Sequence, residues 1–436
     1  MSLEAAGIPT VAVHTHVFAR LARATALANG MPTARQAYVP QPLVDRSPAQ
    51  LRAYIEGPDP ISKRPFIQEI IEALSGPLCD EDRKGLSFER IHPRLLEPDS
   101  EENLQQFFME QRWTDFLPVV LPTEARVAAM LKGTNHPAEK IVGRLSPTNF
   151  RESWEFDVEK VAVNAVMAGA RPEYFPVILA MASSGLTARN SSTTSFAGIG
   201  VVNGPIRNEI GMNGSIGALG PYNHANTTIG RAWNLLSQNL QGGSVPGESY
   251  MGSLGNMSSY SATFPENEER SPWEPLHVRY GFKRTDSAVT VFRGGRYMQA
   301  GYGPRATWQE KFKRALTAGS ARQSPLIVVD PIVARLFTEL GFDSKQKLID
   351  WVAENVTIPA REYWDDQWVQ TLVHPLAVAG VEPYATNLKA APDDSLEMYR
   401  PEEINIVVTG GETQGAWRIY EGSRLKDCTI SIDAWR

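Results

Sequence analysis

Short apolar runs that end in a turn and lead into a helix recur along the chain, at residues 9–23, 117–131 and 325–337. In each, valine and isoleucine are followed by polar residues or proline, and then by a segment rich in alanine, leucine and arginine. A short apolar run bounded by turn residues is typical of a strand buried on both faces, and a strand that leads into an amphipathic helix is half of a β–α–β unit. The pattern predicts an α/β fold: repeated strand–helix modules with mostly parallel sheets around a glycine-rich central domain.

The same rules predict further elements and two breaks. Strands are expected at 34–40, 196–202, 288–292 and 404–409, and helices at 47–56, 66–74, 155–168, 171–182 and 344–355. Ser47 and Pro48 fit the N-cap and first position of the first of these helices. Residues 91–110 and 292–309 lack apolar periodicity and are expected to be linkers or long loops. The breaks divide the chain into a small α/β module that is N-terminally incomplete (1–105), a central glycine-rich α/β domain (106–300) and a C-terminal α/β module (301–436).

Composition and charge narrow the class of protein. The 436 residues are 42% hydrophobic, which excludes a disordered chain. A net charge of −6, from 43 basic and 49 acidic residues, gives no basic domain for nucleic acid. Apolar runs reach about ten residues, too short to span a bilayer, and two cysteines indicate a reducing compartment. We expect a cytoplasmic homo-oligomer that acts on a small molecule, without nucleic-acid or membrane partners.

A glycine-rich segment, residues 211–230, carries the strongest binding signal. It holds five glycines and three asparagines, and apolar residues at helical spacing follow it. Backbone N–H groups at a helix N-terminus suit an anion, with Asn226, Thr227 or Thr228 as the cap and Arg231 in the first turn. The alternative is a structural loop whose glycines need positive φ. The segment fits neither dinucleotide nor P-loop patterns. With the turn at Asn203, the predicted substrate-binding residues are Asn203, Asn213, Gly214, Asn223, Asn226, Thr228 and Arg231.

Two histidines, His14 and His16, stand where the first predicted strand ends. Residues two apart on a strand share a face, and ligands of open α/β sheets bind beyond carboxyl strand ends. Two imidazoles there would hold a divalent transition metal as cofactor, with His224, His277 or an acid as the third ligand. The alternative is that one ring packs or caps while the other is solvated.

An acidic cluster, Glu266, Glu268, Glu269 and Glu274, precedes His277. A carboxylate beside an imidazole orients the ring and tunes its pKa, which suits general acid–base catalysis. The alternative is a solvated acidic turn. The predicted catalytic residues are His224, Glu268, Glu274 and His277.

Several long strings resemble the UGSC-motif (seleno)protein family: residues 156–173, 202–207, 211–232 and 265–277, together with the first 75 residues, which resemble its small domain. The family is named for a Sec/Cys-Gly-Ser-Cys string that would lie just before Met1. A version of the family also has cysteine where this chain has Ala170. Neither thiol is present here, so the resemblance implies that the motif lies upstream of Met1 or on a separate chain, or that this member has lost it.

Three functions follow from these observations. The first is a small-molecule enzyme that uses acid–base or metal-assisted chemistry, of lyase, hydratase or hydrolase type, on a polar, anionic substrate. The second is a thiol or selenol oxidoreductase whose U/C-Gly-Ser-Cys element lies upstream or on a small partner chain. The third is a non-catalytic binding or scaffold subunit.

The two cysteines of the chain are not expected to react. Cys79 lies beside acids that raise a thiol pKa, and Cys428 is expected to be structural.

Overall fold

A computed structural model of the chain describes residues 8–28, 34–43, 46–77, 94–145, 154–188, 197–220, 222–241, 255–256, 263–301, 305–321, 323–423 and 428–436. Helices and mixed sheets make it an α/β protein, as predicted. Within these ranges no helix combines the length and the apolar character needed to cross a membrane.

The N-terminal residues form a small unit around two strands. β1 (Ala12–Thr15) pairs in parallel with β2 (Gln36–Val39), and η1 (His16–Phe18), α2 (Ala19–Ala28), α3 (Pro48–Glu56) and α4 (Phe66–Ser75) accompany them. Ala37, Val39 and Phe66 make its core. Ser47 caps α3 by accepting a hydrogen bond from Gln50 N, with Pro48 in the first turn, which confirms the prediction.

A seven-stranded mixed sheet organises the rest of the described chain. Its order is β11 (Asn405–Val408), β8 (Pro325–Val329), β12 (Ala416–Ser423), β7 (Ala288–Gly301), β5 (Ala197–Asn203) and β6 (Thr263–Pro265), and β13 (Thr429–Ser431) also pairs with β7. β11–β8 and β5–β6 are parallel, while the other described pairings are antiparallel. The prediction of mostly parallel sheets is wrong because β7 and β12, which lie between the parallel pairs, run against their neighbours. One sheet thus takes strands from both sides of residue 300.

The sheet curls around an apolar core of its own. Residues of six strands meet on its inner face, among them Ile199, Phe264, Phe292, Val328 and Val407. At the sheet's edges, the backbone N–H just beyond β6, at Asn267, donates to Val408 O of β11 at 2.8 Å. This contact brings the carboxyl ends of β6 and β11 together.

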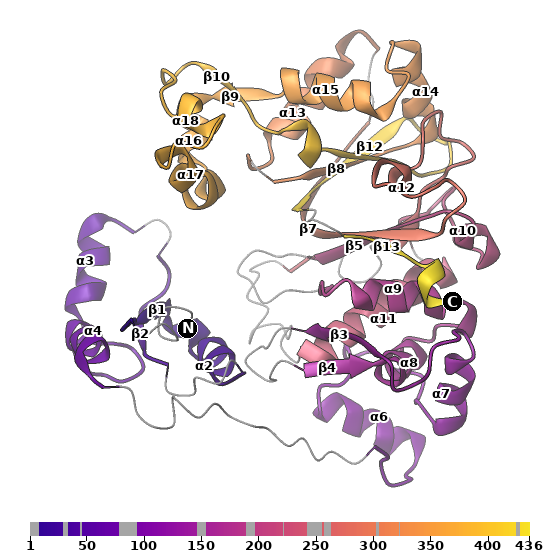
Figure 1. Ribbon diagram of the computed structural model, residues 1–436, viewed down its shortest axis with the longest axis horizontal. Helices are drawn as coiled ribbons and strands as arrows, with labels where there is room; N and C mark the ends of the chain where they lie inside the picture. Colours follow the sequence, from indigo (N-terminus) through magenta and orange to yellow (C-terminus); the bar gives the residue numbers. More distant parts are fainter. Residues whose placement is uncertain are drawn as a thin grey trace.

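Two groups of helices cover the outside of the sheet (Figure 1). The first includes α8 (Val158–Met167), α9 (Phe175–Ser183) and α11 (His224–Gln241), which pack on the β5 and β7 side with α6 (Glu101–Glu110) and α7 (Glu124–Leu131). The second includes α13 (Trp308–Thr317), α14 (Pro331–Glu339) and α15 (Lys345–Asn355), which pack on β8, β11 and β12. Shorter elements complete the described chain: β3 (Ile141–Leu145), β4 (Trp154–Asp157), η2 (Pro172–Tyr174), α10 (Ile206–Glu209), α12 (Leu276–Arg279), η4 (Arg305–Thr307), β9 (Thr357–Pro359), α16 (Ala360–Asp365), η5 (Val369–Val373), α17 (His374–Val378), α18 (Tyr384–Asn387), β10 (Ser395–Glu397), η6 (Pro401–Glu403) and η7 (Asp433–Trp435).

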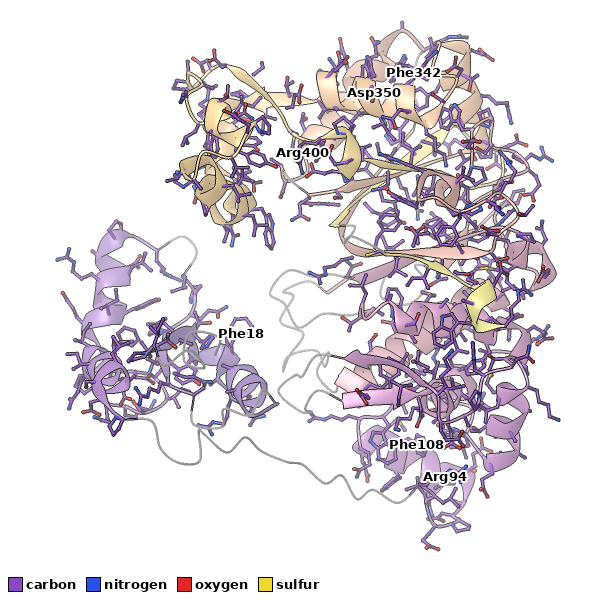
Figure 2. The ribbon with its side chains drawn as sticks, in the orientation of Figure 1. Phe18, Arg94, Phe108, Phe342, Asp350 and Arg400 are labelled. Atoms are coloured by element: carbon purple, nitrogen blue, oxygen red, sulfur yellow. The ribbon has the colours of Figure 1, made fainter. Side chains whose placement is uncertain are left out.

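Three stretches between residues 91 and 157 differ from the sequence prediction. Residues 154–157 form β4, and the helix begins only at Val158, because Asp157 is its N-cap and accepts from Lys160 N. The expected loop 91–110 contains α6, which carries Phe108 (Figure 2). The Phe108 ring packs edge-on against Trp113, with 5.3 Å between the ring centroids. Residues 117–121 form no strand among the described residues, since the prolines at 118 and 122 lack N–H donors.

Candidate functional site

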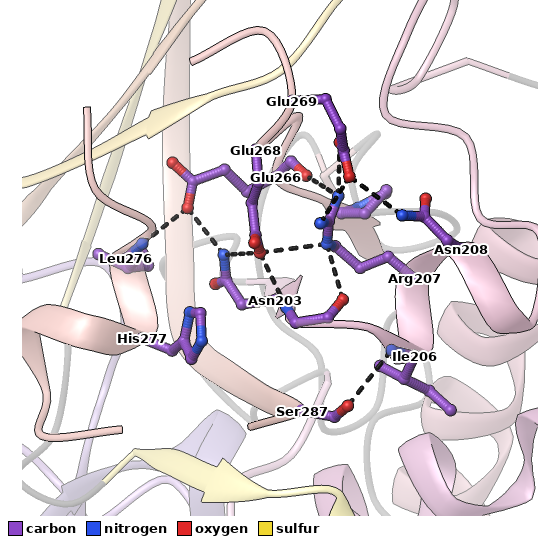
Figure 3. Close-up of polar contacts among 12 residues, drawn as sticks. Asn203, Ile206, Arg207, Asn208, Glu266, Glu268, Glu269, Leu276, His277 and Ser287 are labelled. Carbon is purple, nitrogen blue, oxygen red and sulfur yellow. Dashed lines mark hydrogen bonds and ion pairs between the residues drawn. The ribbon is translucent and has the colours of Figure 1, made fainter. Parts of the chain in front are cut away.

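Polar side chains gather beyond the carboxyl ends of β5 and β6, where β6 meets β11 (Figure 3). β5 supplies the asparagine, α10 the arginine, the loop after β6 the three glutamates, and α12 the histidine. They are Asn203, Arg207, Glu266, Glu268, Glu269 and His277. Carboxyl strand ends are the usual position for ligand sites in α/β sheets.

The carboxylate of Glu266 is fully buried and fully hydrogen-bonded. Its Oε2 accepts from Asn203 Nδ2 at 2.8 Å and from Leu276 N at 2.7 Å. Its Oε1 accepts from Lys345 Nζ at 2.5 Å and from Val408 N at 3.3 Å. A buried carboxylate is tolerated when it has a counter-charge and a complete set of donors. Glu266 is therefore a junction that ties β5, α12, α15 and β11 together.

Glu268 is held by the turn that follows β5. Its Oε1 accepts from Asn203 Nδ2 at 3.0 Å and from Gly204 N at 2.8 Å. Gly204 has φ +86°, and a Cβ there would lie 2.1 Å from Asp286 O, so only glycine fits this turn. The predicted Asn-Gly-Pro turn thus aims one amide and one N–H at the same carboxylate.

Arg207 is buried and approaches the same oxygen of Glu268. Its Nε lies 3.1 Å from Glu268 Oε1 and donates to Gly204 O at 2.9 Å. Its two terminal nitrogens bond both oxygens of Glu269, and these hydrogen bonds lower the pKa of Glu269 to about 2. Through these contacts, Arg207 holds the carboxylates of Glu268 and Glu269 in place.

Two buried acceptor atoms in this cluster have no hydrogen-bond donor among the described residues. They are Oδ1 of Asn203 and Nδ1 of His277, and both side chains are fully buried. Asn203 turns Oδ1 away from the glutamates because its Nδ2 donates to both Glu266 and Glu268. A buried polar atom without a partner is costly, so a hydrogen-bond donor would stabilise each of these two atoms.

The protonation state of His277 follows from its surroundings. Its Nε2 lies 3.0 Å from the carbonyl oxygen of Lys283, which can only accept, so Nε2 carries the proton and Nδ1 holds a lone pair. Burial lowers the pKa of His277 below its ordinary value, while Glu268 in particular opposes this shift. The ring is therefore neutral near pH 7, with a carboxylate close enough to stabilise a positive charge.

The asparagines of the glycine-rich segment bond mainly within that segment. Asn213 Nδ2 donates to Ile216 O and Asn223 Oδ1, both at 2.8 Å, and Asn226 Nδ2 donates to Asn213 O at 2.9 Å. The expected cap was Asn226, Thr227 or Thr228, but α11 already begins at His224 and contains all three. Contact of these amides with a substrate stays a prediction, although the structure gives each of them partners in the loop.

Other predicted residues also have partners or positions that the sequence did not indicate. Arg231 lies further along α11 than predicted, and pairs with Asp115 at 2.9 Å. Thr228 donates to His224 O at 2.7 Å, and His224 is exposed, 3.3 Å from the Tyr174 hydroxyl. Glu274 is exposed and takes no part in the described hydrogen bonds of the cluster. Of the four predicted catalytic residues, the structure thus brings Glu268 and His277 together. 

Gly214 does lie at the cluster's edge. Its carbonyl oxygen accepts from Gly410 N at 2.9 Å and from Thr409 Oγ1 at 3.2 Å. Thr409 also donates to Pro265 O at 3.0 Å, next to Glu266. The glycine-rich segment and the acidic cluster are therefore neighbours.

The two N-terminal histidines occupy different elements. His14 is on β1, its ring 6.3 Å from that of Tyr38, while His16 begins η1, so they do not share a strand face. Burial lowers the pKa of His14. Across the described ranges no group of three or more His, Cys, Asp or Glu side chains could hold a metal. The pair alone supplies two ligands, too few for a usual protein metal site, and the metal prediction remains untested.

Arg207 and Lys345 are the important residues that the sequence analysis missed. Arg207 belongs to a string that had been noted only for its resemblance, and Lys345 follows the cap of a predicted helix. A signal existed for Arg207, since it follows the Asn-Gly-Pro turn by two residues. None existed for Lys345, whose carboxylate partner lies 79 residues away.

Comparison with known protein families adds one finding. The sequence model of the UGSC family matches residues 1–57, which confirms the predicted resemblance over that segment. No curated protein sequence matches the chain. His14 and His16 lie inside the matched segment, whereas the cluster around Glu268 and His277 lies outside it.

Proposed function

We propose that this chain is a small-molecule enzyme that uses general acid–base chemistry, of lyase, hydratase or hydrolase type, with His277 as the group that moves the proton. The observation that carries the proposal is the pair of buried acceptors, His277 Nδ1 and Asn203 Oδ1, that lack a donor among the described residues. A substrate hydroxyl or a water molecule supplies such a donor.

Each residue has a distinct role in the proposed reaction. Nδ1 of the neutral His277 takes the proton from the hydroxyl or water, because the Lys283 carbonyl already fixes the proton on Nε2. Oδ1 of Asn203 orients the same group. The Glu268 carboxylate, which raises the pKa of His277 against the effect of burial, stabilises the imidazolium that forms.

Two features support the proposed substrate class: the burial of the two acceptor atoms, and the contact of the glycine-rich segment with the acidic cluster. Because both acceptors are fully buried, the reacting group must be small. We retain a polar, anionic substrate, such as a small hydroxy acid or its ester, because the glycine-rich segment reaches the cluster through Gly214. No step is assigned to a metal. A cytoplasmic location and a homo-oligomeric assembly remain predictions from the sequence.

The state of the His277 ring tests this proposal directly. In ¹⁵N-detected NMR we expect Nε2 to be protonated, Nδ1 to be unprotonated, and the pKa of His277 to lie below its ordinary 6.5. Since the unfolded chain takes up this proton near pH 6.5 and the folded chain takes it up only at lower pH, the free energy of unfolding should fall as the pH drops below 6.5. A proton on Nδ1 at pH 7, or a pKa above 6.5, would contradict the proposed base.

The match of residues 1–57 to the UGSC family supports a second candidate, a thiol or selenol oxidoreductase. Its U/C-Gly-Ser-Cys element would lie upstream or on a small partner chain. Cys428 is buried, and Cys79 lies outside the described residues. This candidate predicts that the DNA upstream of Met1, or a small neighbouring gene, encodes Sec or Cys followed by Gly-Ser-Cys. The absence of both would rule out this candidate.

A further inference from the structure

A cavity of about 370 Å³, with both polar and apolar walls, lies on the other side of α10 from the acidic cluster. This volume is at the small end of the range of about 300–1,000 Å³ that is usual for ligand pockets. α10 lies between the two places, because Arg207 bonds the acidic cluster while Ile206, Glu209 and Ile210 line the cavity. The cavity is also lined by Lys132, Gly133, Thr134, Asn135, Glu173, Pro176 and Arg436.

The walls of the cavity come from segments that are far apart in sequence and are fixed to one another. Thr134 Oγ1 donates to Trp435 O at 2.7 Å, and Arg436 pairs with Glu209 at 2.7 Å. At Gly133, an added Cβ would lie 2.1 Å from Pro172 O, so the backbone after α7 is in close contact with the start of η2. The cavity is therefore held open by the fold before any ligand binds.

The charges on the cavity wall differ in whether they are paired. Arg436 and Glu209 neutralise each other. Lys132 and Glu173 are exposed, and neither forms an ion pair within the described part of the chain. Among the described residues, one cation and one anion without an ion-pair partner thus line a space that also has an apolar wall, made by Pro176, Ile206 and Ile210.

We propose that this cavity binds an α-amino acid with an aliphatic side chain. The ligand's carboxylate pairs with Lys132, its ammonium group pairs with Glu173, and its side chain lies on Pro176, Ile206 and Ile210. A zwitterion can pair with both groups at once, whereas a ligand with a single charge can pair with only one of them. The site is separate from the proposed reaction and does not depend on His277.

Isothermal titration calorimetry of the full chain with L-leucine tests this inference. We expect L-leucine to bind at least tenfold more tightly than 4-methylpentanoate, which lacks the ammonium group, or 3-methylbutylamine, which lacks the carboxylate. Lys132→Met and Glu173→Gln should each weaken binding of L-leucine at least fivefold. Both side chains are exposed, so neither variant should change the melting temperature. 

The matched control is Lys347→Met, an exposed lysine on α15 that pairs with Asp343, and it should leave binding unchanged within twofold. Three results would each overturn the inference: no heat of binding with L-leucine up to about 10 mM, equal affinity for 4-methylpentanoate, or affinity for L-leucine that neither variant changes. Activity at the His277 site is not part of the readout, so failure here is distinct from failure of the proposed function.

Discussion

Replacing Lys345 with methionine is expected to lower the free energy of unfolding by about 3–5 kcal/mol, because the substitution leaves a buried carboxylate without its counter-charge. Lys345 Nζ lies 2.5 Å from Glu266 Oε1, and the side chains are 9% and 0% exposed. Methionine keeps nearly the same length and shape, so packing changes little. Urea unfolding followed by tryptophan fluorescence gives the measurement.

A neighbouring lysine on the same helix provides the control. Lys347 pairs with Asp343 at 2.7 Å, but both side chains are more than half exposed, so Lys347→Met should change stability by about 0.5 kcal/mol or less. Adding Glu266→Gln to Lys345→Met should restore part of the loss, since the buried charge is then removed as well. Equal effects of the two lysine substitutions would show that the buried pair contributes nothing measurable.

Local sequence signals predicted the fold well wherever one residue type has one structural role. Ser47 caps α3, with Pro48 in its first turn, as the sequence pattern predicted. The expected loop after residue 292 was wrong for a physical reason. Gly294 interrupts the apolar pattern of β7, yet glycine is needed there, because a Cβ would lie 2.6 Å from the Ile199 side chain on β5. A glycine that close packing between two strands requires was therefore interpreted as a sign of a loop.

The candidate site was predictable only as far as its residues lie close in sequence. Glu268 and His277 are nine positions apart, and their pairing was expected from that stretch alone. Arg207 and Lys345 meet their carboxylates across 62 and 79 residues, a distance over which no local pattern extends. Nor does the sequence of the glycine-rich segment indicate that its amides bond mainly to one another, because asparagine in a loop suits a ligand and a turn equally.

The largest effect on activity is expected from His277→Gln, which should lower kcat about 10²–10⁴-fold, the range typical of losing a general base. Glutamine can still donate to the Lys283 carbonyl, so the local hydrogen bond survives while the titrating group is lost. The assay is turnover of small hydroxy acids, for dehydration, and of their esters, for hydrolysis. A chain that turns over none of them would favour the binding or scaffold function instead.

The pH profile separates loss of the base from a structural defect. The wild-type rate should fall on the acid side as His277 takes up a proton, at a pH below the ordinary histidine pKa because burial lowers the pKa of this ring. His277→Gln should remove that limb of the profile, whereas His374→Gln, an exposed histidine on α17, should keep both the rate within twofold and the limb. If the acid limb persisted in His277→Gln, the proton would be moved by another group, and Glu268, held by Arg207 and Asn203, would be the next residue to replace.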